Sequence, residues 1–143
     1  MNQSELFWVL GHEIRPQDIT GDYDLISGTT PAQTQGPPPH THQRYHEVFI
    51  VTEGEMEFVI DGRPTTARKG DVINLPPDTI HTFANKTHQP CQWINIHSPK
   101  GFLQFFREFG ISSAENNAQM RSVSPELIQG VMKNAKKYDM HIQ

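Results

Sequence analysis

The sequence is poor in cysteine, basic charge and long apolar runs. Cys91 is the single cysteine in 143 residues, which excludes an internal disulfide framework and a zinc module built on several thiolates. No apolar run approaches the roughly 18 residues that a membrane-spanning helix needs. The first residues, MNQSELFWVLGHEIRP, lack the basic region and the long apolar segment of a signal peptide. We therefore expect a cytoplasmic protein with no membrane partner.

Basic residues are outnumbered by acidic ones. Twelve Lys and Arg residues stand against 16 Asp and Glu residues, which gives a formal net charge of −4. A nucleic-acid-binding surface needs a concentration of positive charge, so we expect no nucleic-acid partner. A chain of this length buries enough surface to build one core without staples, and we expect a single domain over residues 1–143.

The middle of the chain has the pattern of a β-protein. From Glu47 onward, short runs rich in β-branched and aromatic residues alternate with turn signals about every ten residues. Asp61-Gly62 is a strong two-residue hairpin signal. The expected strands cover residues 47–51, 56–60, 64–68, 72–75, 80–84 and 92–97, with shorter candidates at 7–10 and 24–28. Many short strands with regular turns favour an all-β sandwich or barrel over a parallel sheet with crossover helices.

The pattern becomes helical after residue 98. Four phenylalanines repeat at the spacing of one helix face and are followed by Gly110 as a stop signal: Phe102, Phe105, Phe106 and Phe109. A second helix is expected to begin with Ser124 as N-cap and Pro125 in its first position. We therefore expect a C-terminal helical segment over about 101–140, packed outside the β-domain.

Half of the eight histidines lie within the β-region, at positions 40, 42, 46 and 81. His40 and His42 are two residues apart, so in an extended chain their side chains point to the same face. Glu47 is an odd number of residues away from both, so in one unbroken extended chain its side chain would point to the other face. Either His46 is the third group on that face, or the chain bends between Gln43 and His46 and brings Glu47 round. We favour the bend, because residues 43–46 lack the alternation of a strand.

A later strand supplies His81. Three imidazoles and one carboxylate form a mixed nitrogen and oxygen set, which suits one divalent first-row metal: Fe, Mn, Ni, Co, Cu or Zn. The residue types do not decide between these metals. Four protein ligands on a six-coordinate ion leave positions for water, substrate or dioxygen, as metal catalysis requires.

At these positions the sequence resembles the cupin superfamily. The first cupin motif is matched by GPPPHTHQRYHEVFIVTEG at 36–54, and the second by GDVINLPPDTIHTFAN at 70–85. The spacer before His40 is shorter than is usual in the family, and Asp78 stands where a glycine is more common. The resemblance implies a jelly-roll β-barrel (a double-stranded β-helix) with its core at about 20–98. It also implies a metal inside the barrel on His40, His42, Glu47 and His81.

A finer resemblance links the chain to small single-domain bacterial cupins similar to quercetin 2,3-dioxygenase. It is carried by GPPPHTH before the barrel and by PKGFLQFFREF at 99–109. It implies a homodimeric, metal-dependent dioxygenase that acts on a small aromatic or enol-type substrate with dioxygen as co-substrate. Glu47 would take the substrate proton as the catalytic residue.

Two other functions fit the same residues. One is a cyclase, isomerase or decarboxylase in which the metal only polarises a carbonyl or enolate. The other is a cupin that binds a small molecule without catalysis. We expect the substrate pocket to be largely aromatic, with four candidate wall residues: Phe49, Phe58, Phe83 and Trp93.

The remaining polar candidates are expected to have lesser roles. We expect His46 to be a neighbour of the site, and His97 to be a surface or core histidine that could also support a ligand. We expect His12, His88 and His141 at the surface. Asn85 is expected to satisfy turn backbone, and Cys91 to be a passive thiol.

Overall fold

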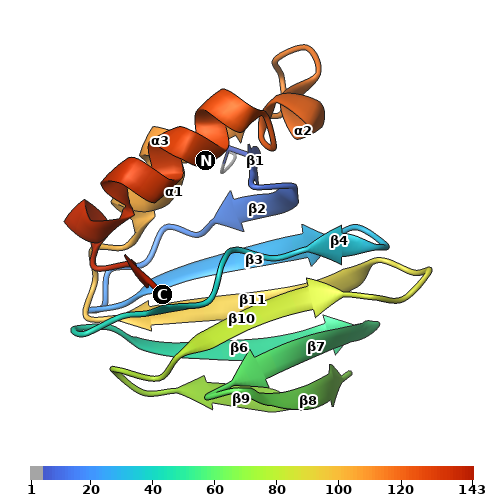
Figure 1. Cartoon of the computed structure of the whole chain (residues 1–143), viewed down its shortest axis with the longest axis vertical. Coiled ribbons are helices and arrows are strands. Elements are labelled where there is room, and N and C mark those ends of the chain that lie inside the picture. Colours follow the sequence, from blue (N-terminus) through green and yellow to red (C-terminus); the bar gives the residue numbers. More distant parts are fainter. Residues whose placement is uncertain (1–4) are drawn as a thin grey trace.

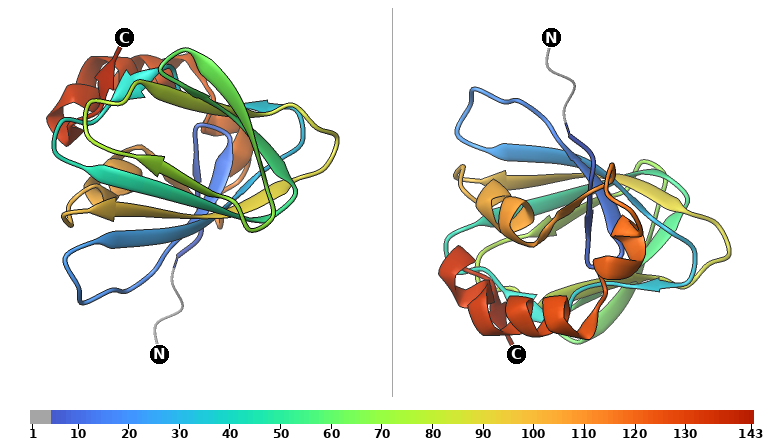
Figure 2. Two further views of the ribbon diagram at one scale, coloured as in Figure 1. Left: turned by 90° about the horizontal axis from the view of Figure 1, so that it is seen from below. Right: turned by 90° about the horizontal axis from the view of Figure 1, so that it is seen from above.

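The computed structural model describes residues 5–143 as two antiparallel sheets that face each other (Figures 1 and 2). The first sheet has seven strands, in the order β12 (Ile111–Ser112), β1 (Phe7–Val9), β2 (His12–Pro16), β3 (Asp24–Thr30), β11 (Cys91–Ser98), β6 (His46–Glu53) and β9 (Val72–Leu75). The second has the order β13 (His141–Ile142), β5 (His40–Thr41), β10 (His81–Asn85), β7 (Glu55–Ile60) and β8 (Arg63–Arg68), with β4 (Thr34–Gln35) also paired to β10. This is the jelly-roll arrangement that the sequence predicts.

Alternation along the strands separates the interior from the surface. In β6, Glu47, Phe49 and Val51 are buried while the residues between them are more exposed. β11 buries every second residue in the same way, from Cys91 to His97. Because side chains of a strand point alternately to opposite faces, polar Glu47 and His97 enter the same interior as the aromatic core.

Positive backbone φ angles explain several residues at the turns. Asp61 and Gly62 have φ of 48° and 81°, as a two-residue hairpin turn of type I′ requires, and they join β7 to β8. Asp78 has φ of 66°, so the motif position that usually carries glycine is a left-handed one that aspartate tolerates. Position 36 requires glycine for a different reason, because there is no room for a Cβ: it would collide with the backbone carbonyl of Phe83.

Three helices and a 3₁₀ turn gather at the end of the barrel beside β1 and β2, away from β8 and β9 (Figure 1). They are α1 (Leu103–Phe109), α2 (Ala118–Arg121), α3 (Pro125–Asn134) and η1 (Ala135–Tyr138). Gly110 ends α1 as expected. The Ser124 hydroxyl caps α3 by accepting the Leu127 backbone N–H at 3.3 Å. Within residues 5–143, no helix is long and apolar enough to span a membrane.

The sheets extend beyond the expected barrel limits of about 20–98 at both ends of the chain. The β1–β2 hairpin adds two strands beside β3, and β13 pairs with β5 near the C-terminus. The sequence pattern predicted β1 only as a short candidate, and β2, β12, β13 and α2 not at all. Strands and helices of two to five residues carry too few positions for a period to be recognised.

Candidate metal centre

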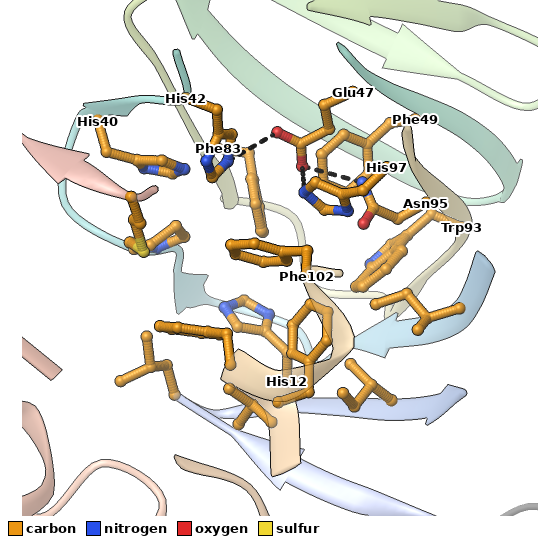
Figure 3. A pocket seen from close by; sticks show the side chains of 18 residues that line it. His12, His40, His42, Glu47, Phe49, Phe83, Trp93, Asn95, His97 and Phe102 are labelled. Atoms are coloured by element: carbon orange, nitrogen blue, oxygen red, sulfur yellow. Dashed lines mark hydrogen bonds and ion pairs between the residues drawn. The ribbon is translucent and has the colours of Figure 1, made fainter. Parts of the chain in front are cut away.

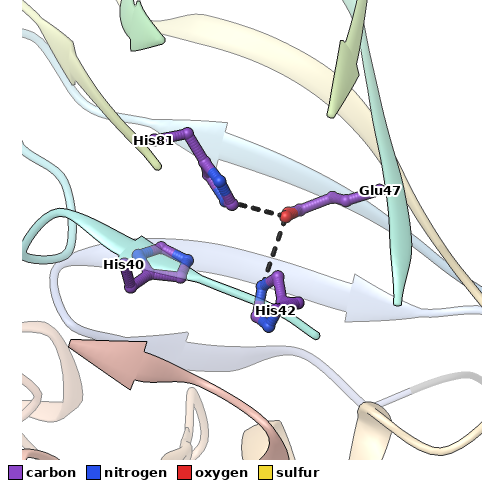
Figure 4. Close-up of side chains that lie close together, drawn as sticks. All are labelled: His40, His42, Glu47 and His81. Carbon is purple, nitrogen blue, oxygen red and sulfur yellow. Dashed lines mark ion pairs between the residues drawn. The ribbon is translucent and has the colours of Figure 1, made fainter. Parts of the chain in front are cut away.

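Four buried side chains, contributed by both sheets, meet inside the barrel (Figure 4). His40 lies on β5, His42 follows that strand, Glu47 lies on β6 and His81 on β10. One nitrogen or oxygen atom from each lies within 4.8 Å of the corresponding atoms of the others. The structure therefore brings together all four residues that the sequence motifs single out.

Local geometry explains how Glu47 joins the histidines. The chain bends at Gln43 and Arg44, and β6 then begins with His46 exposed and Glu47 buried. Of the two alternatives left open by the sequence, the bend is correct. Across the sheet, β10 pairs His81 directly with His40, and the centroids of their two rings lie 4.3 Å apart.

Backbone carbonyls fix the orientation of the three rings. The Nδ1 atoms of His40, His42 and His81 lie 2.8, 2.8 and 2.9 Å from the carbonyl oxygens of Pro38, Asp139 and Thr79. A carbonyl only accepts hydrogen bonds, so we assign the proton of each neutral ring to Nδ1. Each Nε2 then carries a lone pair, which is the tautomer that a metal-ligating histidine needs.

The carboxylate of Glu47 lies against these nitrogens. Its Oε2 is 2.9 Å from His81 Nε2 and 3.3 Å from His42 Nε2. At these distances the two nitrogen lone pairs and the carboxylate repel one another unless a cation, either a proton or a metal ion, lies among them. The donor set fits a divalent first-row metal, because neutral imidazole and carboxylate are ligands that such ions accept.

Burial and the neighbouring charges act in opposite directions on the pKa values of the candidate metal ligands. Burial alone raises the pKa of Glu47, but His97, His42 and His81 more than offset this and hold it well below its usual range. Burial alone lowers the pKa of His81, but the Glu47 carboxylate raises it overall. Burial lowers the pKa of His40 to about 3, with help from His81. An ionised Glu47 and a neutral His40 are both ready to act as ligands at neutral pH.

Asn95 of β11 holds the other oxygen of Glu47, and His97 of the same strand lies close to it. Asn95 Nδ2 donates to Oε1 at 2.9 Å, and His97 Nε2 lies 3.3 Å from the same oxygen. Both side chains are buried, and burial lowers the pKa of His97 to about 4. Asn95 was not predicted from the sequence, although its alternation with Trp93 and His97 on one strand would have placed it inside.

A cavity of about 70 Å³ is lined by three of the four residues, His40, His42 and Glu47 (Figure 3). Three of the expected wall residues line it: Phe49, Phe83 and Trp93. Phe58 does not; it packs behind the wall with its ring centroid 5.1 Å from that of Phe49. Phe102, from the turn before α1, also lines the cavity and stacks on His97 at 4.2 Å. The phenylalanine stripe thus contributes to both the core and the cavity.

The remaining histidines differ in their outcome. The expectation that His12 lies at the surface is wrong: it is 5% exposed and lines the cavity, because the unexpected strand β2 carries it inward. His46 and His88 are exposed, and His141 is partly buried beside Asp139. Asn85 satisfies the backbone carbonyls of Thr30, Pro31 and Gln89, as expected of it. Cys91 is buried, and burial raises its thiol pKa to about 11, which leaves it protonated and unreactive.

The C-terminal segment supports the centre from outside the barrel. Asp139 has φ of 58°, and its backbone carbonyl accepts the Nδ1 proton of His42. Its carboxylate accepts the backbone N–H groups of Gln43 and Arg44 at 3.1 and 2.7 Å. This one residue therefore holds both a candidate ligand and the bend that follows it.

Comparison with known proteins agrees with this architecture. Residues 28–97 match the family model described as a cupin domain. Quercetin 2,3-dioxygenase of Bacillus subtilis is 30% identical over 71 residues, which are 50% of this chain and only 21% of that enzyme.

Solved structures of low sequence identity share the fold. An RmlC-like cupin from Shewanella frigidimarina has a TM-score of 0.61 at 21% identity, covering 68% of this chain and 86% of that one. The nucleoside dehydratase Pac13 of Streptomyces has a TM-score of 0.60 at 16% identity, covering 71% and 81%.

Proposed function

Because residues 28–97 of this chain form a domain of the cupin superfamily, we propose that the protein is a metal-dependent enzyme acting on a small molecule inside the barrel. The preferred reaction is a dioxygenation of an aromatic or enol-type substrate. Its support is the similarity to quercetin 2,3-dioxygenase over half of the chain, together with the aromatic cavity beside the ligand set.

One observation carries the metal assignment. Three buried histidines each give their Nδ1 proton to a backbone carbonyl and direct Nε2 toward a buried carboxylate. Without a shared cation this arrangement is costly, because buried lone pairs and charge are left uncompensated. We propose His40, His42, Glu47 and His81 as the ligands of one divalent transition metal ion.

The residues around the candidate metal centre have separate roles in the proposed reaction. A metal bound there would act as a Lewis acid for a substrate oxygen. The aromatic walls exclude water and hold an apolar substrate body against the ligand set. Glu47 is proposed to accept the substrate proton; its lowered pKa makes it ionised at neutral pH but a weak base, so the transfer requires a substrate hydroxyl already made acidic.

A reaction without dioxygen is the second candidate, such as an isomerisation, cyclisation or decarboxylation. The size of the cavity argues against a flavonol substrate, because about 70 Å³ is below the roughly 300–1,000 Å³ of typical ligand pockets and a flavonol would require wall residues to move. A nucleoside dehydratase is among the structures of similar fold, which supports a reaction other than dioxygenation. A protein that binds a small molecule without catalysis is the remaining alternative.

The test begins with metal content. We expect wild-type protein reloaded with Mn, Fe, Co, Ni, Cu or Zn to retain about one ion per chain by elemental analysis. His40→Ala should lose this retention, whereas His46→Ala, a change at an exposed histidine next to Glu47, should keep it. Unchanged metal content in His40→Ala would refute the ligand assignment.

Oxygen consumption then separates the reactions. Each metal-loaded form is given quercetin in an oxygen electrode, and we expect uptake with at least one metal. If no metal supports uptake while metal retention is normal, dioxygenation of a flavonol is refuted and the metal site stands.

Assembly and location stay predictions. We propose a homodimer, because β9 and β8 end the two sheets and Val72 on β9 is 60% exposed, and unpaired edges favour pairing with a second chain. We likewise propose a single domain over residues 1–143 in the cytoplasm.

A further inference from the structure

His12 lies on a hairpin that closes one end of the barrel. Leu10 and Gly11 form the turn between β1 and β2, with φ of 49° and 86°, and the hairpin crosses the barrel opening (Figure 2, left). His12 and Ile14 occupy the buried face of β2. In Figure 3, His12 lies across the cavity from Glu47, with the ring of Phe102 between them. It is therefore part of the cavity but not of the candidate metal centre.

A chain of hydrogen bonds fixes the tautomer of His12. Trp93 Nε1–H donates to the hydroxyl oxygen of Thr30 at 2.9 Å, and an indole can only donate. The Thr30 hydroxyl has its own hydrogen to donate, and His12 Nδ1 lies 3.0 Å away. We assign Nδ1 as the acceptor, which places the ring proton on Nε2.

His12 Nε2 is left without a hydrogen bond. It is buried and has no partner within hydrogen-bond geometry among residues 5–143. Burial lowers the pKa of His12 to about 4, although the Gln35 backbone carbonyl lies near enough to the ring to oppose this shift, so the ring is neutral at neutral pH. That carbonyl lies outside hydrogen-bond geometry and leaves Nε2 unsatisfied. Buried polar groups without partners are rare and costly, which makes this N–H a donor prepared for an acceptor that enters the cavity.

From this geometry we propose that His12 binds the substrate, with Nε2–H donating a hydrogen bond to an uncharged oxygen at the end of the substrate remote from the metal. The inference rests on the proposed function and narrows its substrate class. The substrate would be a small apolar body, such as one ring, that lies beside the Phe102 ring and carries one oxygen for the metal and one for His12.

The charge around the cavity explains why the remote oxygen is uncharged. Among residues 5–143, the ionisable side chains lining it are four histidines and Glu47, with no lysine or arginine. A carboxylate or phosphate group at the His12 end of the ligand would lose its hydration and would meet no lysine or arginine side chain in its place. A hydroxyl or carbonyl oxygen needs only the single neutral donor that His12 supplies.

A pair of ligands of equal shape tests this assignment. Hydroquinone and 4-methylphenol share a phenol oxygen for the metal and differ at the opposite position, a hydroxyl against a methyl group. Their dissociation constants are measured by calorimetry, without oxygen, on zinc-loaded wild type, His12→Phe and His12→Gln. We expect the preference for hydroquinone over 4-methylphenol to fall about three- to tenfold in His12→Phe, the range of one hydrogen bond. His12→Gln should retain much of it, because its amide also donates.

The outcomes separate this inference from the proposed function. Zinc content is measured on each sample, and folding is checked by circular dichroism. Retained zinc with the same ligand preference in wild type and in His12→Phe would overturn the role of His12 and leave the metal site intact. Loss of zinc from wild type would refute the metal site, whereas the ligand preference would still report on His12. If wild type binds neither ligand, the role of His12 is refuted as well.

Discussion

The buried, neutral His12 makes a quantitative prediction about stability in acid. In the folded protein its pKa is lowered from 6.5 to about 4 because burial removes the ring from water. Between pH 6.5 and about pH 4, the ring of His12 binds a proton in the unfolded chain but not in the folded protein. Stability from this group is therefore fully present above about pH 6.5 and is lost as pH falls toward 4.

The magnitude follows from proton linkage. One pKa unit corresponds to about 1.36 kcal/mol, so a shift from 6.5 to about 4 amounts to about 3 kcal/mol when both states are fully titrated. At pH 5 the unfolded ring is almost fully protonated and the folded ring almost neutral, which gives about 2 kcal/mol. We expect His12→Gln, which does not titrate, to lose about 2 kcal/mol less than wild type between pH 7.5 and pH 5.

Urea unfolding monitored by tryptophan fluorescence measures the difference. Both proteins are unfolded at several pH values in the presence of a chelator, so that metal-linked protons do not contribute. His88→Gln is the matched control, because His88 is exposed in the folded protein and this variant should follow wild type. If His12→Gln loses as much stability as wild type on going to pH 5, the burial argument is wrong.

Two further predictions concern residues that hold the site in place. Gly36→Ala should lower the free energy of unfolding by about 1–3 kcal/mol, because the new methyl group meets the Phe83 backbone carbonyl. Thermal unfolding beside Gly130→Ala in α3, where a Cβ makes only an ordinary contact with Phe109 at 3.9 Å, would show whether the loss comes from the clash. Deleting residues 139–143 removes the carbonyl that accepts the His42 Nδ1 proton and should weaken metal binding roughly 10- to 100-fold. Competition with a chelating indicator measures this affinity, and an unchanged value would show that the backbone carbonyl is not needed.

The sequence predicted the barrel well where strands are long and turns are specific. Asp61-Gly62 and the alternation of Glu47, Phe49 and Val51 led directly to the correct hairpin and interior face. It failed for β2, whose five residues, HEIRP, end in proline and carry a histidine where an apolar residue would mark the core. Short strands depend on tertiary pairing more than on their own pattern, so β2 became visible only through its pairing with β3.

The candidate site was likewise only partly predictable from the sequence. The two motifs identified the four clustered residues because each motif keeps its members within one local stretch of chain. The groups that orient them, Asn95, His97 and Asp139, come from distant segments, and no spacing rule connects them to the motifs. Phe58 illustrates the limit of alternation: it is fully buried but behind the cavity wall, since parity gives the face of a sheet and not the depth within a barrel.

Both ends of the described chain complete the cavity. The β1–β2 hairpin brings His12 to one side of it, and 97 residues separate His42 from the Asp139 carbonyl that fixes its ring. Both contacts depend on strand pairing, because β2 is held by β3 and β13 by β5. The ligand motifs alone therefore specify which residues gather, whereas the tautomer of His42 and the polar character of the cavity depend on the terminal segments. A fragment limited to residues 28–97 would keep the motif residues but lack both His12 and the acceptor of His42.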